Sequence, residues 1–287
     1  MCEQLSLEDL IKKTKKIHNI NQIVRSLCCE FESIHLDKLC EFIKLNTTLS
    51  TDIIKKSNDV LFGSNKKIKS LRQAISILGK NGVYPIIIND TLQHTIKFDD
   101  IYMYDINAIG LQYLNTSRSI FLKNLCNELK IDKEIFNQLN TVSMFSIIGI
   151  VLCAVALEFN QQGETFKKLK SDYYIPDLEK KLLGYSSYDV VYTMFKHWQL
   201  EDILIFVSHE LPYFGNEYLV DKNNIKTYAF IITTIHYIIR SDGKFKLDSK
   251  IVDIFKKTGL GESNLINAFK KSFGDTMIET PPANCPS

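Results

Sequence analysis

Proline and arginine are both scarce in this sequence of 287 residues. Only six prolines are present, and three of them lie after residue 280. Because proline interrupts helix interiors, this distribution allows long helices over the rest of the chain. The four arginines are Arg25, Arg72, Arg118 and Arg240. Few side chains are therefore suited to bidentate recognition of phosphates or nucleic-acid bases.

An excess of charge of either sign is also lacking. Lys and Arg number 35 against 33 Asp and Glu, which gives a net charge of +2 at pH 7. Such a chain lacks the excess positive charge that attracts a nucleic acid or an anionic membrane surface, so we expect neither as a partner. The longest apolar stretch, residues 144–157, is shorter than the roughly 20 residues of a spanning helix. We interpret it as a buried core helix and expect a cytoplasmic protein with no membrane span, since the N-terminus has no apolar signal core.

The common signatures of metal, disulfide and nucleotide chemistry are absent. The seven cysteines are odd in number and include no Cys-x-x-Cys pair, which argues against a disulfide framework or zinc site. No histidines lie four residues apart, no His-Asp pair occurs, and the glycines do not form a phosphate-binding loop. Nothing marks a base for a serine or cysteine nucleophile. We therefore expect no cofactor.

Helix signals recur along the chain. Serine is followed three residues later by an acid or amide at three candidate helix starts, and Asp132 precedes an apolar run. The serine starts are Ser6, Ser70 and Ser186. With apolar residues at helical spacing, these signals predict about a dozen helices in an all-α fold. The β-branched runs 86–88 and 230–239 are interpreted as helical because no hairpin turn flanks them. Loops are expected near 63–69, 160–178, 212–224 and 240–248.

A change in pattern also suggests subdivisions. Lys97, Asp99 and Asp100 interrupt the apolar pattern, which predicts a break near 95–105 between an N-terminal helical subdomain and a larger bundle. Residues 1–19 are expected to form an N-terminal helix extension. The proline-containing segment 271–287 is expected to be a disordered tail.

Residues 49–79 contain a specific pattern in which one predicted helix ends and the next begins. The positions that form it are Asn58, Phe62, Gly63, Ser70, Ala74, Ile75, Leu78 and Gly79. The Asn58 side chain can bond backbone groups left free at a helix end, and Gly63 can adopt a left-handed conformation. The segment resembles the hallmark stretch of HDOD domains, an Asn-Ser-Ala-Phe-Phe-Gly-like turn followed by Ser-Ile-x-x-Ala-Ile-x-x-Leu-Gly. We expect these residues to be mainly structural.

Two later segments extend the resemblance to about residues 20–270. The stretch from Gly184 to Trp198 is similar to the HDOD pattern Gly-x-x-His, an amphipathic helix and Trp-x-Leu-Pro, with His209 aligned loosely to a following His-His pair. Residues 144–149 resemble the Leu-Leu-His-Asp-Ile-Gly motif of the wider HD superfamily. The resemblance implies one HDOD domain made of two helical subdomains. Trp198 is expected to be a core anchor.

The resemblance also implies a degenerate metal site. HD phosphohydrolases hold a metal through a first His, a His-Asp doublet and a distal Asp, with further histidines in the cyclic di-GMP phosphodiesterase branch. The corresponding positions here are Leu114 or Asn115, Ser146, Ile147, Ser187 and Ile239. Serine hydroxyls and isoleucines cannot replace imidazoles and carboxylates as ligands. His209 is the one histidine expected near this pocket, in a structural role, and we expect no enzyme activity.

HDOD domains, which this chain resembles, are bacterial regulatory modules, and several of them act in two-component, motility or cyclic-dinucleotide pathways. The resemblance implies signal transduction through protein partners, with a small ligand possible in the former active-site cleft. The alternative is a metal-dependent HD-type phosphohydrolase acting on nucleotides or cyclic dinucleotides. It would need a rebuilt metal site in which His209 meets Asp99, Asp100, Asp105 and Glu210.

Overall fold

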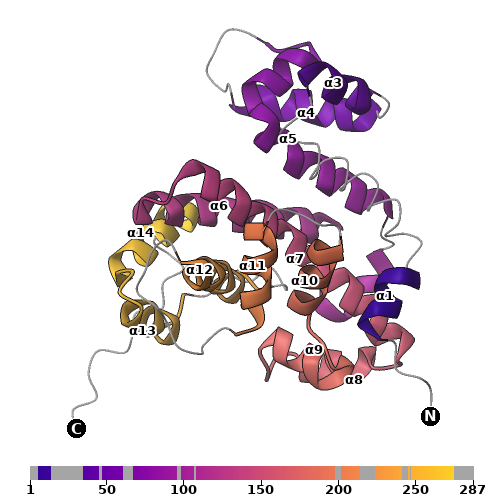
Figure 1. Ribbon diagram of the computed structural model, residues 1–287, viewed down its shortest axis with the longest axis vertical. Coiled ribbons are helices and arrows are strands. Elements are labelled where there is room, and N and C mark those ends of the chain that lie inside the picture. Colours follow the sequence, from indigo (N-terminus) through magenta and orange to yellow (C-terminus); the bar gives the residue numbers. More distant parts are fainter. Residues whose placement is uncertain are drawn as a thin grey trace. The chain divides into compact units, whose positions relative to one another are not determined.

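The described part of the chain is all-α, as predicted. The computed structural model describes residues 6–13, 35–44, 47–60, 67–95, 98–106, 108–197, 202–213, 224–240, 245 and 247–274. These residues form thirteen α-helices and two 3-10 helices (Figure 1). An isolated antiparallel bridge joins Ile239 to Phe245.

The chain divides into two compact units. The large unit contains Met1–Ile11, Phe98–His197 and Glu201–Ser287, and the small unit contains Lys12–Lys97 and Trp198–Leu200. The described residues of each unit include their own set of buried apolar side chains.

The small unit packs three helices around an apolar core. They are α3 (Leu36–Lys44), α4 (Thr47–Val60) and α5 (Leu71–Thr95). Apolar side chains four residues apart share one helix face, as with Leu39 and Ile43, both of which are fully buried. Inside α5, Gly79 has φ 68° and ψ 166°, so the first helical segment ends there. Residues 86–88 are helical, which confirms the interpretation of that run as helix.

The large unit is built around α7 (Lys133–Phe159), which packs against α6 (Ala108–Leu129), α10 (Ser187–His197), α11 (Asp202–Glu210) and α12 (Ile225–Ile238). By length and composition α7 is the one helix among the described residues that could cross a membrane, but 83% of its most apolar window is buried inside the fold. The prediction of a core helix over 144–157 is confirmed.

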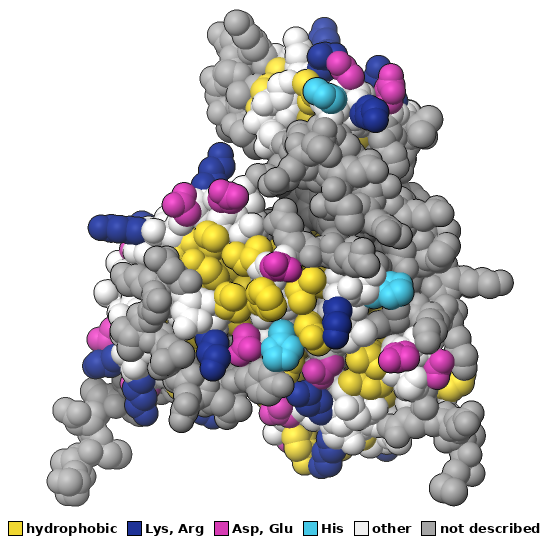
Figure 2. Space-filling model, viewed as in Figure 1, with side chains coloured by type: hydrophobic (Ala, Val, Ile, Leu, Met, Phe, Trp, Pro, Cys, Tyr) yellow, Lys and Arg dark blue, Asp and Glu magenta, His cyan; other side chains and the backbone are white. Residues whose placement is uncertain are grey.

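Shorter elements complete the large unit. They are α1 (Leu7–Lys13), η1 (Phe98–Tyr104), α8 (Gly163–Leu169), α9 (Ile175–Leu183), η2 (Leu211–Tyr213), α13 (Ser249–Lys257) and α14 (Glu262–Phe273). Figure 2 shows hydrophobic side chains on the surface over α6 and α11. Two large ones among the described residues are Ile120 and Phe206, which are 46% and 50% exposed.

Two predicted helix starts have the expected capping geometry. The Asp9 amide donates to Ser6 Oγ at 3.1 Å. The Ser186 amide donates to Asp189 Oδ2 at 2.8 Å, and the Asp189 amide returns a bond to Ser186 Oγ at 3.3 Å. Asp132 precedes α7 but makes no capping bond with its side chain.

Two predictions of irregular structure were wrong. The expected loop 160–178 contains α8 and the start of α9. Phe166 anchors α8, because the centroid of its ring lies 4.5 Å from that of the Tyr104 ring. Pro176 occupies the first turn of α9, where proline is tolerated. The expected tail 271–287 begins too early, since residues 271–273 still belong to α14. Residues 275–287 lie outside the described residues.

Candidate binding site

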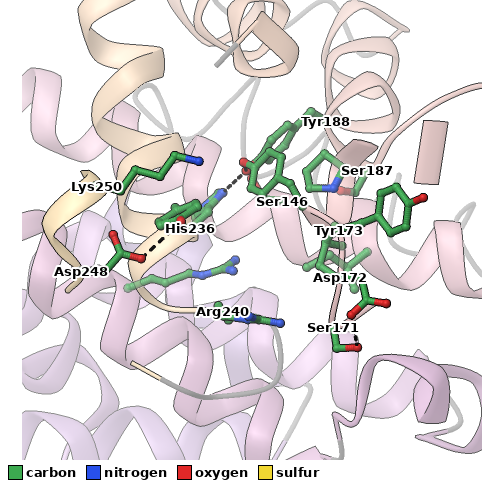
Figure 3. Close-up of a pocket in the computed structure, with 16 residues that line it drawn as sticks. Ser146, Ser171, Asp172, Tyr173, Ser187, Tyr188, His236, Arg240, Asp248 and Lys250 are labelled. Carbon is green, nitrogen blue, oxygen red and sulfur yellow. Dashed lines mark hydrogen bonds between the residues drawn. The ribbon is translucent and has the colours of Figure 1, made fainter. Parts of the chain in front are cut away.

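A cavity of about 330 Å³ lies in the large unit, where α6, α7, α10 and α12 converge with the segment 171–176 and the start of α13 (Figure 3). Its wall combines serines, tyrosines and charged side chains. The labelled charged residues in Figure 3 are Asp172, Arg240, Asp248 and Lys250. The site is therefore polar although it borders the core helix α7.

Arg118 is the most buried cation of this wall. It lies on α6 and is only 3% exposed. Its Nε and Nη2 atoms donate to the carbonyl oxygen of Ile239, at 3.2 and 3.0 Å. Burial lowers the pKa of Arg118 to about 10, so the guanidinium still carries its charge at neutral pH. The third nitrogen, Nη1, is buried and has no hydrogen-bond partner among the described residues.

A chain of hydrogen bonds runs through His236 on α12. Its Nε2 lies 3.0 Å from Ser143 Oγ, and its Nδ1 lies 3.0 Å from the hydroxyl of Tyr188. The Tyr188 hydroxyl lies 3.2 Å from that of Tyr174. Burial, followed by the charge of Arg118, lowers the pKa of His236 well below its usual range. A neutral imidazole has one donor and one acceptor nitrogen, and both are used here, so neither ring nitrogen is left for a metal.

Ser187, at the start of α10, is held by a buried carboxyl group. The Ser187 amide donates to Glu179 Oε2 at 2.6 Å, and the Tyr104 hydroxyl donates to Glu179 Oε1 at 2.8 Å. Burial raises the pKa of Glu179 to about 7 despite these hydrogen bonds, which lower it. Glu179 therefore positions Ser187 from behind the cavity wall.

The remaining charged groups of the wall have mixed signs. Asp248 caps α13, because its Oδ1 accepts from the Ile251 amide at 3.0 Å. Asp172 accepts from Ser171 Oγ at 3.1 Å. With Arg118, Arg240 and Lys250, three cations and two carboxylates line the cavity, so its described wall has a formal charge of +1 when His236 is neutral.

The structure brings together only some of the positions predicted for the vestigial HD site. Ser146 and Ser187 line the cavity, and Ile239 supplies the carbonyl oxygen that binds Arg118. Ile147 is fully buried and is not among the lining residues. His209 lies exposed on α11, with Nδ1 3.1 Å from Glu210 Oε1, and is not among the lining residues either. The histidine of the cavity wall is therefore His236.

The HDOD motif residues lie mostly in the small unit. Asn58 Nδ2 donates to the carbonyl oxygens of Ile54 and Ile68 at 2.9 and 3.0 Å, and its Oδ1 accepts from the Ile68 amide at 2.8 Å. Ser70 precedes α5, and Gly184 ends α9 with φ 83°. Ala74 and Ile75 are fully buried, and Leu78 is half-buried. Phe62, Gly63 and Trp198 lie outside the described residues.

The side chains at the predicted metal positions do not fit a divalent ion. Isoleucine has no donor atom, and Ser146 Oγ donates to the Val142 carbonyl at 3.0 Å. The charge of Arg118 also opposes binding of a divalent metal ion in the cavity. Across the described residues no group of three His, Cys, Asp or Glu side chains converges.

Two members of the alternative site do lie together, because His209 Nδ1 is 3.1 Å from Glu210 Oε1. A third member, Asp105, pairs instead with Lys170 at 2.5 Å. The side chains of Asp99 and Asp100 lie outside the described residues.

Arg118 and His236 were not predicted as site residues. One signal for Arg118 was available in the sequence, because this arginine stands four residues after Leu114 and four before Leu122, on an apolar helix face. A charge at such a position is buried when that face is buried, and a buried charge requires a specific environment. His236 had a weaker signal, since it stands within an apolar helix.

The HDOD domain family matches residues 16–210 of this sequence. No curated protein matches the chain. A solved structure with a similar fold is that of a virulence factor from Campylobacter jejuni subsp. jejuni, with a TM-score of 0.52 and 17% sequence identity over 93% of this chain and 98% of that one. At this identity the likeness concerns the fold alone. The extent of the domain from residue 210 to 270 stays a prediction.

Proposed function

Because this chain belongs to the HDOD domain family, we propose that it is a non-catalytic regulatory protein that acts by binding other molecules. The family is related to the HD phosphohydrolases and is generally regarded as lacking their catalytic metal site. The observation that carries the proposal is the cavity wall, where Ser146 and Ser187 lie with the buried cation Arg118.

The chemistry of this wall supports binding over hydrolysis. A metal-dependent phosphohydrolase uses the ion to generate a hydroxide nucleophile and to neutralise charge on the phosphoryl group. Arg118 can supply positive charge, but a guanidinium with a pKa near 10 cannot lower the pKa of a water as a bound metal does. His236 is held neutral between two hydroxyl groups and is not placed to act as a ligand. The wall can therefore bind a charged group without activating water.

From the family we further infer a cytoplasmic, bacterial role in signal transduction, with motility among the pathways. The chain would exercise this role through signalling protein partners. The phosphohydrolase alternative is not favoured, because no three His, Cys, Asp or Glu side chains converge among the described residues, and Asp105 of its ligand set pairs with Lys170.

An activity comparison tests the non-catalytic claim. The full chain is assayed with nucleotides, cyclic dinucleotides and p-nitrophenyl phosphate in the presence of Mn²⁺, Mg²⁺, Fe²⁺ or Zn²⁺. We expect no turnover that distinguishes the wild type from Ser187→Ala and His209→Ala. Metal-dependent turnover that falls at least tenfold in either variant would contradict the proposal, because a contaminating phosphatase is insensitive to both substitutions.

Reciprocal affinity capture tests the regulatory claim. The full chain is used to capture proteins from its source cells, and each candidate is then used to capture the chain. We expect a signalling protein to be recovered in both directions and to form a complex with the purified chain at micromolar concentration. Failure of every candidate to bind the purified chain would contradict a role through protein partners.

A further inference from the structure

We propose that the cavity of the large unit binds a small organic anion, a carboxylate or a phosphate ester, whose oxyanion group is held by Arg118. The inference rests on the proposed non-catalytic function and names the chemical class of ligand for that site. It is carried by the geometry of Arg118 and by the composition of the wall around it.

Arg118 is a buried charge with incomplete hydrogen bonding. Two of its nitrogens bind the carbonyl oxygen of Ile239, and Nη1 has no partner among the described residues although the residue is only 3% exposed. Burial lowers the pKa of Arg118, and the neighbours that raise it are Tyr188 and Tyr174 rather than a carboxylate. Burying a charged donor without its hydrogen bonds is costly. An oxyanion in the cavity that Arg118 lines would offset this buried charge.

The Ile239 carbonyl also fixes the orientation of the guanidinium. Because Nε and Nη2 both bind one oxygen, the planar group is held in a single plane before any ligand arrives. A donor held in this way loses little conformational entropy on binding, and arginine suits the planar oxyanions of carboxylates and phosphates. The arrangement is therefore preorganised for an anion.

The rest of the wall suits an organic body attached to the anion. Four tyrosines line the cavity, which are Tyr173, Tyr174, Tyr188 and Tyr237. Their rings offer flat apolar surface for packing. The volume of about 330 Å³ is within the range of roughly 300–1,000 Å³ usual for small-molecule sites.

Two further cations strengthen the preference for a negative ligand. Arg240 and Lys250 line the same cavity (Figure 3). One carboxylate of the wall, Asp248, is engaged as the cap of α13. The positive formal charge of the wall favours an anion over a neutral molecule of the same shape.

Calorimetric titration of the full chain with three probes tests the inference. The probes are phenyl phosphate, benzoate and benzyl alcohol, which share a ring and differ in charge. The variants are Arg118→Gln and, as the matched control, Arg72→Gln, which removes an exposed arginine of the small unit that pairs with Asp37. We expect at least one anionic probe to bind the wild type and Arg72→Gln with equal affinity, and Arg118→Gln at least tenfold more weakly. Benzyl alcohol should bind at least tenfold more weakly than that anion.

Further measurements separate the possible outcomes. Arg118→Lys keeps a charge but loses the planar fork of the guanidinium. If Arg118→Gln does not fold, Arg118→Lys takes its place as the test variant and should also weaken binding of the anionic probe. Which of the two anionic probes binds more tightly distinguishes a phosphate ester from a carboxylate as the ligand. Absence of binding by both anions, or equal binding by the wild type and folded Arg118 variants, would overturn the inference. Release of inorganic phosphate from phenyl phosphate, followed by ³¹P NMR and lost in Ser187→Ala, would instead overturn the proposed non-catalytic function.

Discussion

Gly149 on α7 lies directly against the backbone of Ser187 on α10. A Cβ atom added to Gly149 would be 2.2 Å from the Ser187 carbonyl oxygen and 3.0 Å from its carbonyl carbon. The absence of a side chain therefore lets the start of α10 approach the core helix, and this approach places Ser187 in the cavity wall.

Gly149→Ala should destabilise the protein by about 1–3 kcal/mol, because the new methyl group must displace backbone rather than a flexible side chain. The higher helix propensity of alanine offsets only about 1 kcal/mol. Urea unfolding measures the change. Gly163→Ala is the matched control, since its Cβ would meet only side-chain atoms, at 3.1–3.3 Å, and should cost less. Equal stability of Gly149→Ala and the wild type would contradict the close approach.

Asn58→Ala should destabilise the small unit by roughly 1–3 kcal/mol, because it leaves the Ile68 amide and two carbonyl groups without the Asn58 bonds. Thermal melting of the full chain measures the loss. Asn58→Asp keeps the acceptor but places a second carboxylate oxygen against the Ile54 and Ile68 carbonyl oxygens, so it should destabilise the unit at least as much as Asn58→Ala. An unchanged melting temperature together with lost binding of a protein partner would make Asn58 a recognition residue.

Glu179 should make stability depend on pH. Its pKa is raised from 4.5 to about 7 in the folded protein, so the folded state binds the proton more tightly than the unfolded state does. The stabilisation is complete below pH 4.5 and is lost as the pH rises through 7, by up to about 3 kcal/mol. Glu179→Gln should therefore remove this loss, and its stability relative to the wild type should increase between pH 5 and pH 8.

Urea unfolding at several pH values follows the difference between the two proteins. His236 acts in the opposite sense, because its lowered pKa costs stability as the pH falls below 6.5, but it is common to both proteins and cancels. Glu164→Gln, at an exposed position, serves as the control. A pH-independent difference between wild type and Glu179→Gln would show that this carboxyl group does not titrate as described.

The buried cysteines should react slowly with alkylating reagents. Cys126 and Cys153 are at most 1% exposed, and burial raises the pKa of Cys126 to about 12 and that of Cys153 well above its usual value. Since the thiolate is the reactive form, iodoacetamide should modify both only after unfolding. Mass spectrometry of native and urea-treated protein compares the rates. Rapid modification of either residue in the native protein would contradict its burial.

Local features could be predicted from the sequence because their causes are local. The capping bonds at Ser6 and Ser186 depend on residues three positions apart, and the core helix follows from a continuous apolar run. The cavity depends on contacts between distant segments. Arg118 and Ile239, for example, are separated by 121 positions, and no spacing rule connects them. The short helix α8 was missed because one buried aromatic, Phe166, anchors a largely polar segment.

Metal content decides whether the cavity works without a catalytic ion. The full chain is dialysed against Mn²⁺ and, separately, Fe²⁺, and bound metal is then measured by elemental analysis for the wild type, Ser187→Ala and His209→Ala. We expect far less than one ion per chain in all three proteins. About one ion per chain in the wild type, lost in either variant, would contradict this expectation.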